Sequence, residues 1–149
     1  MEEVWNYYRL IRFNIQLEEV ELLKMECEKF DVLNITDEPV PLKLNLEVRS
    51  SLKNDSFVEV FLRVTIDFDE NKPFFVRVVY KGVFSQNGTL NEEDFRSQAE
   101  DQAVPLLLPY VREYVSDAIS RMGYSPYYLP TMDVLQSLSN NKQNSQNEE

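Results

Sequence analysis

Four segments of the chain alternate apolar and polar residues with a period of two, which is typical of β-strands with one buried face. The clearest is Leu42–Arg49, where apolar residues alternate with Lys, Asn, Glu and Arg. Val58–Phe68 and Phe74–Lys81 repeat this pattern. The connections Ser50–Ser56 and Asp69–Pro73 are short and rich in turn-forming residues, so these three strands are predicted to form antiparallel hairpins.

The first predicted strand contains a change of phase. Its apolar residues occupy odd positions at Ile11, Phe13, Ile15 and Leu17, and then even positions at Val20 and Leu22. Without an extra residue, this change would turn the core face of the strand to water. A β-bulge or bend is therefore predicted near Glu18–Glu19.

After Asn87-Gly88 the apolar period lengthens, which predicts a long helix. Asn91 is expected to cap a helix that starts at Glu92, and Gly123 is expected to end it. Pro109 lacks an N–H group, so the helix should bend or restart near it. The apolar stripe of this helix consists of Leu107, Val111, Tyr114, Val115, Ala118 and Met122, and is widened by Leu108 and Ile119. Met132–Leu138 predicts one further short helix.

These elements predict an α+β fold, in which a four-stranded antiparallel sheet carries a long C-terminal helix and a shorter one on one face. The 149 residues, 43% of them apolar, fit a single domain, which we assign to residues 1–138. Residues 139–149 contain no apolar residue and are expected to form a disordered polar tail. Leu106–Met122 has more apolar width than one small sheet can bury, which favours oligomerisation or the binding of apolar partners.

Composition excludes several classes of function. The net charge of -11 disfavours a nucleic-acid partner, because phosphate binding needs clustered Lys and Arg. The sequence has no histidine and only three glycines, so we expect neither an enzyme nor a bound metal or cofactor. The single cysteine, Cys27, excludes an intrachain disulfide and indicates a cytoplasmic setting. No apolar run is long enough to predict a membrane span, and the acidic N-terminus does not predict a signal peptide.

Three segments together resemble the SecB family of export chaperones. VEVFLRVTIDF (Val58–Phe68) is similar to the third strand of the family, and FFVRVVYKGVFSQNG (Phe74–Gly88) is similar to its fourth strand and the turn after it. Val104–Val134 is similar to the signature helix and the Pro-containing loop that follows. The matching positions are Pro105, Pro109, Tyr110, Arg112, Glu113, Arg121 and Gly123. Two prolines inside an otherwise helical segment are uncommon, which makes this signature fairly specific.

The resemblance implies a holdase chaperone that binds unfolded polypeptides in apolar grooves, acts in protein export and has SecA as a partner. It also implies a homotetramer, a dimer of dimers assembled through the long helix and the first strand. Two segments of the sequence depart from the usual pattern of the family. Glu19-Val20-Glu21-Leu22-Leu23 keeps one acid of the usual acidic segment, and Phe75-x-Arg77 reverses a charge in a Leu-x-Glu pair used for SecA docking. The alternative is a SecB-like chaperone or interaction protein dedicated to one partner, such as an antitoxin, without SecA coupling.

Three sets of candidate site residues follow. Aromatic and other apolar side chains after the helix, and in the long connection Glu28–Pro41, either line a client groove or cap the core. The predicted client-binding residues are Met25, Phe30, Leu33, Phe75, Tyr124, Tyr127, Tyr128, Met132 and Leu135. The predicted oligomer interface comprises Ile11, Phe13, Leu107, Val111, Tyr114, Val115 and Ala118. Glu19 is the predicted partner-docking residue.

Overall fold

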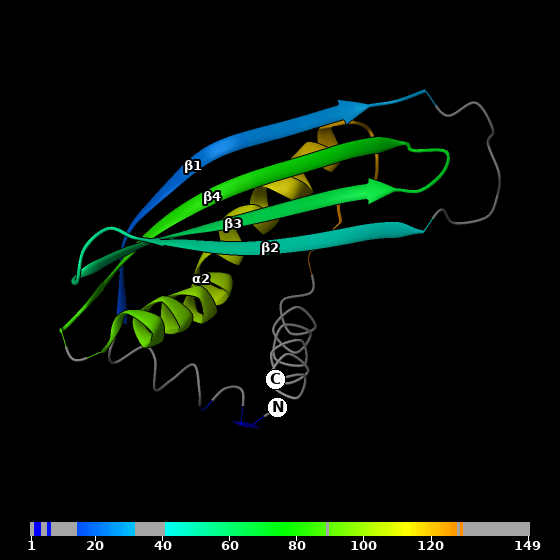
Figure 1. The fold of residues 1–149 in the computed structure, drawn as a ribbon. Coiled ribbons are helices and arrows are strands. Elements are labelled where there is room, and N and C mark those ends of the chain that lie inside the picture. Colours follow the sequence, from blue (N-terminus) through cyan, green and yellow to red (C-terminus); the bar gives the residue numbers. More distant parts are fainter. Residues whose placement is uncertain are drawn as a thin grey trace.

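The computed structural model describes residues 2–3, 6, 15–31, 41–88, 90–127 and 129. Within them, four strands precede one long helix (Figure 1). The elements are β1 (Ile15–Lys29), β2 (Leu42–Leu52), β3 (Phe57–Phe68), β4 (Phe74–Gln86) and α2 (Glu92–Arg121). The α+β class, the four antiparallel strands and the long helix are confirmed, whereas the shorter helix predicted at Met132–Leu138 lies outside the described residues.

The sheet has the strand order β1-β4-β3-β2, and each pair of neighbours is antiparallel. The β2–β3 and β3–β4 hairpins are those that the short connections predict. Strands β1 and β2 form the two edges, so the chain passes from one edge of the sheet to the other between them. This order places the first strand beside the last one, and it brings β1 close to the helix that follows β4 (Figure 1).

Strand β1 departs from regular pairing at two points. The register shifts between Leu17 and Glu19, which confirms the bulge predicted near Glu18. A second shift lies between Leu22 and Lys24. The sequence did not indicate this second irregularity, because the two adjacent apolar residues Leu22 and Leu23 fit either phase of the alternation.

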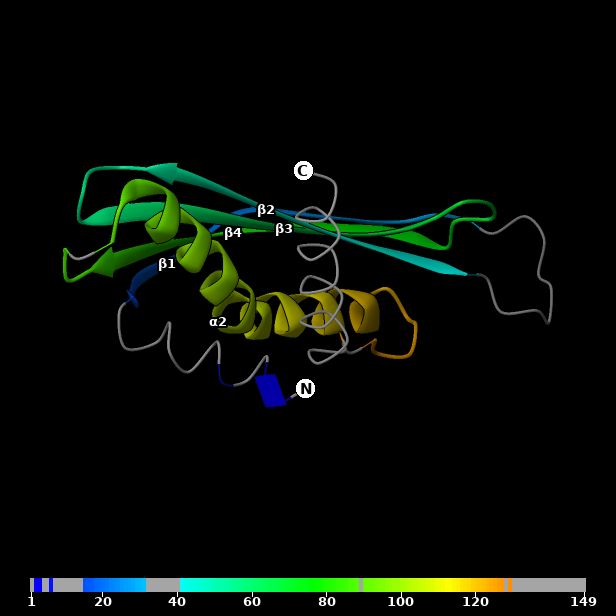
Figure 2. The same ribbon diagram turned by 60° about the horizontal axis from the view of Figure 1, so that its bottom comes forward.

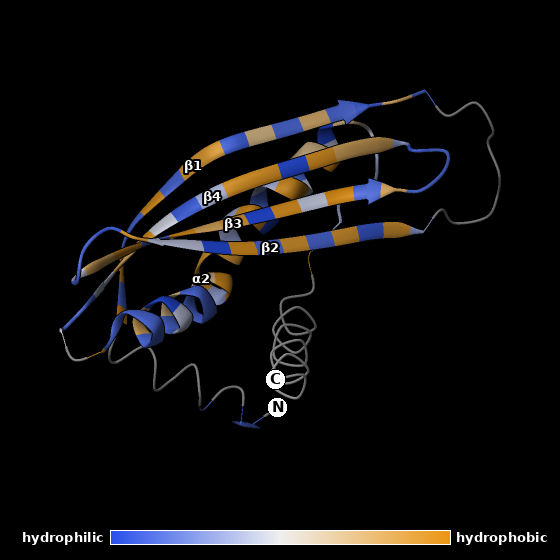
Figure 3. Ribbon diagram, in the orientation of Figure 1, coloured by the Kyte–Doolittle hydropathy of each residue, from blue (hydrophilic) through white to orange (hydrophobic). Residues whose placement is uncertain are grey.

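One face of the sheet forms the core together with α2. Strand residues alternate between this face and the opposite one, which is visible as orange and blue bands along β2 and β3 (Figure 3). The buried residues of β3 are Val58, Val60, Leu62, Val64, Ile66 and Phe68, and those of β4 include Phe74, Val76, Val78 and Phe84. Because antiparallel sheets can leave one face open to solvent, a single helix layer is enough to close this core.

Helix α2 begins at its predicted cap and continues through both prolines. The Asn91 side chain accepts a hydrogen bond from the backbone N–H of Asp94 at 2.8 Å. Pro105 and Pro109 both lie within the helix, and Figure 2 shows its axis bent between the green N-terminal and the yellow C-terminal parts. Each proline removes one intrahelical donor, which accounts for the bend. Gly123, with a φ of 92°, follows the last turn as predicted.

The helix crosses the sheet diagonally, from the β2 edge to the β1 edge (Figure 1). Near its start, the Arg96 guanidinium donates to the hydroxyl and the carbonyl oxygen of Ser50 in β2, both at 3.2 Å. Just beyond its end, the ring centroid of Tyr124 lies 5.4 Å from that of Phe74 in β4 and 5.4 Å from the Lys29 ammonium of β1. The C-terminal half of α2 therefore lies over β4, beside the edge strand β1.

Much of the apolar stripe predicted as an oligomer interface belongs to the core of this chain. Leu107, Val111 and Val115 are completely buried, Ala118 is 4% exposed, and Tyr114 is partly buried. Periodicity identifies the apolar side of a helix but not the surface that covers it, and here that surface is the sheet of the same chain. The two remaining predicted interface residues, Ile11 and Phe13, lie outside the described residues.

Candidate functional site

Exposed apolar side chains are concentrated at the β1 edge of the molecule. Among the described residues, the exposed large hydrophobic ones are Leu22 (38%), Leu23 (46%), Met25 (50%), Phe57 (38%) and Tyr110 (45%). Three of these lie within four consecutive residues of β1. This edge, next to the second bulge, therefore carries most of the exposed large apolar side chains among the described residues.

The register of β1 against β4 directs part of this apolar edge toward the side of the sheet that carries α2. Leu22 pairs with Tyr80, and Met25 pairs with Val78. Residues directly opposite each other in an antiparallel pair point to the same face, and Val78 is a core residue. Leu22 and Met25 therefore share the face that α2 covers, yet they stay exposed because α2 lies over β4 rather than over β1.

Three tyrosines continue this surface onto β4 and α2. The ring centroids of Tyr80 and Tyr110 lie 5.7 Å apart, and their planes are tilted by 42°. Tyr114, one helical turn after Tyr110, is hydrogen-bonded to Cys27 of β1. We call the surface formed by Leu22, Met25, Cys27, Tyr80, Tyr110 and Tyr114 the β1–α2 strip.

A hollow of about 590 Å³ lies within the strip, between β4 and the C-terminal half of α2. Its described lining residues are Tyr80, Tyr110, Glu113, Tyr114, Ser116, Asp117, Ser120 and Pro126. This size is in the range of sites that accept small molecules or individual side chains. The lining combines aromatic rings with carboxylates, whereas the neighbouring part of β1 contributes aliphatic side chains.

The side chains of Tyr80 and Tyr114 are both uncharged at neutral pH. Burial raises the pKa of Tyr80, and the nearby Glu113 carboxylate raises it further. Burial, followed by the hydrogen bond with Cys27, raises the pKa of Tyr114 to about 12. These rings therefore present neutral aromatic faces and hydroxyl groups to anything that enters the hollow.

The predicted client-binding residues fall in different environments. Met25 is half-exposed on the β1–α2 strip, and Phe30 is partly buried just after β1. Tyr124 and Tyr127 pack partly buried against the core, which corresponds to the capping alternative for these two rings. The remaining residues of this set outside β4, namely Leu33, Tyr128, Met132 and Leu135, lie outside the described residues.

Phe75 and Glu19 lie on the opposite face of the sheet. The Arg77 guanidinium lies 5.1 Å from the centroid of the Phe75 ring, and its Nε donates to the Thr65 hydroxyl at 3.2 Å. Arg77 also lies 4.0 Å from Glu26 of β1. Since alternate residues of a strand point to opposite faces, Phe75 cannot share a groove with the core-side tyrosines.

Charged residues on this opposite face are paired across the strands. The Lys81 ammonium lies 2.9 Å from Glu21 of β1 and 3.9 Å from Glu59 of β3, which links three strands. The hydrogen bond to Glu21 raises the pKa of Lys81. Exposed ion pairs of this kind contribute little to stability, but they make this face polar compared with the β1–α2 strip.

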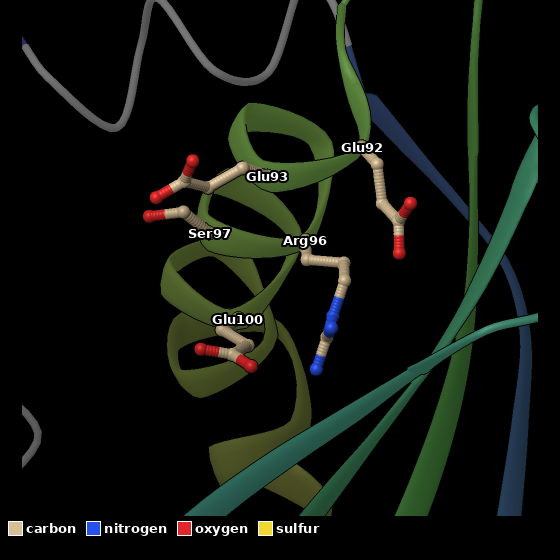
Figure 4. Close-up of a pocket in the computed structure, with 5 residues that line it drawn as sticks. All are labelled: Glu92, Glu93, Arg96, Ser97 and Glu100. Atoms are coloured by element: carbon tan, nitrogen blue, oxygen red, sulfur yellow. The ribbon is translucent and has the colours of Figure 1, made fainter.

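A second hollow, of about 360 Å³, lies along the first turns of α2 and is lined by Glu92, Glu93, Arg96, Ser97 and Glu100. Figure 4 shows Arg96 extending toward the strands, whereas Glu93 and Ser97 lie on the other side of the helix. Arg96 and Glu100 both hydrogen-bond to Ser50. This hollow therefore surrounds a contact that holds the helix to β2, and the described residues that line it are all polar or charged.

The described part of the chain contains no group of three or more His, Cys, Asp and Glu residues that could hold a metal ion. None of the helices described is long and apolar enough to cross a membrane.

Sequence reasoning did not select Tyr80, Tyr110 or Leu22 as site residues. Alternation assigned Tyr80 to the core face of its strand, which is correct. The ring is accessible at this edge because β1 lies next to β4, and a local sequence pattern cannot predict which strands pair. The tilted contact with Tyr110 depends in turn on the diagonal course of α2.

An open four-stranded sheet with one long helix on one face is the architecture of SecB-like chaperones. A SecB-like chaperone from Mycobacterium tuberculosis, solved in complex with a ChAD peptide from the HigA1 antitoxin, superimposes on this chain with a TM-score of 0.67. The two chains are 16% identical, and the match covers 86% of this chain and 98% of that one. At this identity the likeness is one of fold.

Sequence comparison gives the family. The family described as "Preprotein translocase subunit SecB" matches residues 13–146, so the chain belongs to the SecB family. The protein-export protein SecB of Dechloromonas aromatica is 31% identical over 120 residues, which cover 78% of each chain. That of Orientia tsutsugamushi (strain Boryong) is 27% identical over 111 residues, 73% of this chain and 69% of that protein. The predicted membership is confirmed. Members of this family are chaperones rather than enzymes, as expected for this chain.

Proposed function

We propose that this protein is a holdase that binds extended segments of unfolded polypeptides along the β1–α2 strip. The observation that carries the proposal is the exposure of Leu22 and Met25 on the α2 side of β1, next to Tyr80, whose ring contacts that of Tyr110. Contiguous exposed apolar surface in a folded chain commonly marks an interaction site. Met25 adapts easily to different partners, and tyrosine rings bury much area at a low cost in conformational entropy.

The strip supports weak binding by each chain and stronger binding by an assembly. Burial of apolar surface contributes about 25 cal/mol per Å², and the cost of ordering the client offsets part of this gain. Several strips on one oligomer would bind one long client with greater avidity. We therefore propose the homotetramer, a dimer of dimers, as the working form. The outer edge of β1, whose backbone groups have no neighbouring strand among the described residues, is the surface that supports it.

We place the protein in the cytoplasm, in the pathway of protein export with SecA as a partner. The names of its relatives, which are protein-export proteins, support this assignment. Glu19, on the outer face of β1, remains the proposed docking residue.

A second candidate is a chaperone dedicated to one partner, such as an antitoxin, without SecA coupling. Arg77 favours it, because this cation occupies the position where the family resemblance implies an acidic docking residue. Its guanidinium contacts Phe75, Thr65 and Glu26, so the reversed charge has a fixed position on the face of the sheet opposite α2. The complex of the Mycobacterium tuberculosis SecB-like chaperone with an antitoxin peptide supports the same candidate.

Aggregation of an unfolded test protein, followed by light scattering, tests the holdase proposal. We expect suppression by the wild-type protein and clearly weaker suppression by the double variant Leu22→Asp/Met25→Asp. Phe57→Asp is the matched control, because Phe57 is as exposed as Leu22 but belongs to β3. No suppression by the wild-type protein at any ratio would reject the proposal.

Capture with purified SecA and with cell extract separates the two candidates. Binding of SecA that is weakened by Glu19→Lys supports the export function. A single stoichiometric folded partner, together with no affinity for SecA or for unfolded chains, supports the dedicated function instead.

A further inference from the structure

We propose that Asn87 is a site of spontaneous covalent modification, at which the side-chain amide is lost and isoaspartate forms, and that this product loosens the connection between β4 and α2. The inference is independent of the proposed function, because it concerns a segment outside the β1–α2 strip. Asn87 directly follows β4, and it is the one asparagine of the sequence that precedes a glycine. The connection lies at the same end of the sheet as the turn between β2 and β3 (Figure 1).

The backbone nitrogen of Gly88 is the nucleophile that this reaction needs. Gly88 has no side chain to shield its nitrogen, and its φ of 85° lies in the region that favours glycine. Asn87 and Gly88 are both exposed, and a methyl group at position 88 would meet no heavy atom within 4 Å, so water has open access. Within the described part of the chain, neither the Gly88 N–H nor the Asn87 side chain makes a hydrogen bond. Both reacting groups are therefore free.

The reaction exchanges the side-chain nitrogen of Asn87 for oxygen from water. The Gly88 nitrogen attacks the side-chain carbonyl carbon of Asn87, and the new C–N bond closes a five-membered succinimide ring. The bond from that carbon to the amide nitrogen breaks, and ammonia leaves with the proton of the Gly88 N–H. Water then opens the ring at either carbonyl, which gives aspartate or isoaspartate. In isoaspartate the main chain runs through the side-chain carbonyl carbon, so it is longer by one methylene group.

Two other asparagines of the described structure are held away from this reaction. The Asn54 side chain accepts two backbone hydrogen bonds at 2.9 Å, and that of Asn91 accepts one at 2.8 Å. These bonds must break before the side-chain carbon can turn toward the following backbone nitrogen. The residues that follow, Asp55 and Glu92, also have side chains that crowd that nitrogen. We therefore expect Asn87 to react faster than either of them.

The Gln86 side chain spans the connection in which the modification falls. Its Oε1 accepts a hydrogen bond from the Leu90 N–H at 3.0 Å, and its Nε2 donates to the carbonyl oxygens of Asp55 at 2.9 Å and Leu90 at 3.3 Å. These bonds fix the distance between the end of β4 and the residue before the Asn91 cap. An added methylene group between Gln86 and Leu90 changes this distance and weakens the bonds, whereas aspartate at position 87 leaves the main chain as it was.

Incubation of the folded protein at neutral pH in water labelled with heavy oxygen, followed by digestion and mass spectrometry, tests the modification. We expect one heavy oxygen in the peptide that contains Asn87, and labelling of that peptide by an isoaspartate-specific methyltransferase. Conversion at Asn87 should be at least about tenfold faster than at Asn54 or Asn91. It should be within about threefold of the rate in a synthetic peptide of residues 85–90, because exposed connections open at almost no cost. Asn87→Gln is the matched control, because its longer side chain would have to close a six-membered ring and should stay unmodified.

Urea denaturation measures the consequence for the fold. We expect the isoaspartate fraction, separated by chromatography, to unfold at a lower urea concentration than freshly prepared Asn87→Asp, which carries the same charge on an ordinary main chain. An unmodified Asn87, or a rate in the folded protein more than about threefold below that of the peptide, would overturn the proposal. Conversion of Asn54 or Asn91 at a similar rate would show that the fold does not select Asn87, which also overturns it. Equal urea midpoints for the isoaspartate fraction and Asn87→Asp would show that the product does not loosen the connection.

Discussion

Gly82 in β4 lies so close to the side chain of Leu17 in β1 that a methyl group at position 82 would press against it. A Cβ atom at position 82 would lie 3.2 Å from Leu17 Cδ1 and 2.9 Å from Cε2 of the fully buried Phe84. Glycine at this position therefore allows the edge strand and the core of the sheet to pack closely.

We expect Gly82→Ala to lower the free energy of unfolding by about 1–3 kcal/mol, as is typical of overpacking in a core. Elsewhere in a strand, replacement of glycine by alanine would be neutral or stabilising, because alanine restricts the unfolded chain. Urea denaturation monitored by circular dichroism measures the change. Addition of Leu17→Ala should make the cost of the second substitution smaller than in the wild-type background. Strictly additive effects of the two substitutions would contradict the proposed contact.

The sequence was sufficient to predict which residues of the regular strands are buried. The alternation in Val58–Phe68 names all six core residues of β3, because a period of two leaves only one choice of face. The bulge at Glu18 was also predictable, since the apolar positions change there from odd to even. Asn91 was identifiable as a cap from its side chain and the acidic residues that follow it.

The candidate site was much less predictable, because it depends on pairings between distant segments. Strand β1 lies next to β4 rather than β2, and only this order places Leu22 opposite Tyr80. The width of the helix stripe suggested surplus apolar surface on α2. In the structure, however, Leu107 is buried by the sheet, and most of the exposed apolar residues lie on β1 instead. Local periodicity contains no information about which segment covers which face.

The cap of α2 gives a second prediction. The Asn91 side chain satisfies the N–H of Asp94, one of the donors that a helix start leaves without an intrahelical partner. We expect Asn91→Ala to lower the free energy of unfolding by about 1 kcal/mol. Asn91→Asp is the control, because its carboxylate keeps the acceptor and interacts favourably with the helix dipole. Equal losses in thermal or urea denaturation of the two variants would show that the cap does not stabilise the fold.

Leu107 and Tyr110 should differ strongly in their contribution to stability. Leu107 is completely buried between α2 and the sheet, so Leu107→Ala should cost about 2–5 kcal/mol. Tyr110 is 45% exposed, and Tyr110→Ala should cost less than about 1 kcal/mol. Denaturation at two protein concentrations is the measurement. If the loss in Leu107→Ala came from a subunit interface, it would depend on protein concentration, whereas a core defect within one chain would not cause such a dependence.

The raised pKa of Tyr114 predicts a loss of stability at alkaline pH. Its pKa is raised from 10.0 in the unfolded chain to about 12, so the folded state holds this proton more tightly. The contribution is complete below pH 10 and is lost as the pH rises toward 12. Two pKa units correspond to at most about 2.7 kcal/mol, and the partial exposure of the ring reduces this value.

Tyr114→Phe keeps the ring and removes the titrating hydroxyl. We expect its unfolding free energy to fall less steeply than that of the wild-type protein between pH 10 and 12, as measured by urea denaturation at each pH. Lys81 also loses stabilisation in alkali, because its pKa is raised by Glu21, but this effect is common to both proteins and cancels in the difference. Parallel curves for the two proteins would mean that the Tyr114 proton is not held more tightly in the folded state.

Leu23, in the second bulge of β1, tests the proposed assembly. It is 46% exposed on an edge strand whose outer backbone groups have no neighbouring strand among the described residues. If subunits associate along this edge, Leu23→Asp places a carboxylate in the contact and should lower the mass measured by light scattering from fourfold the chain mass to a smaller multiple. Ser51→Asp is the matched control, because Ser51 is exposed on the opposite edge strand, β2. Its assembly should keep the wild-type mass, and circular dichroism should show both variants folded. A wild-type monomer, or a tetramer that Leu23→Asp leaves intact, would exclude assembly through β1.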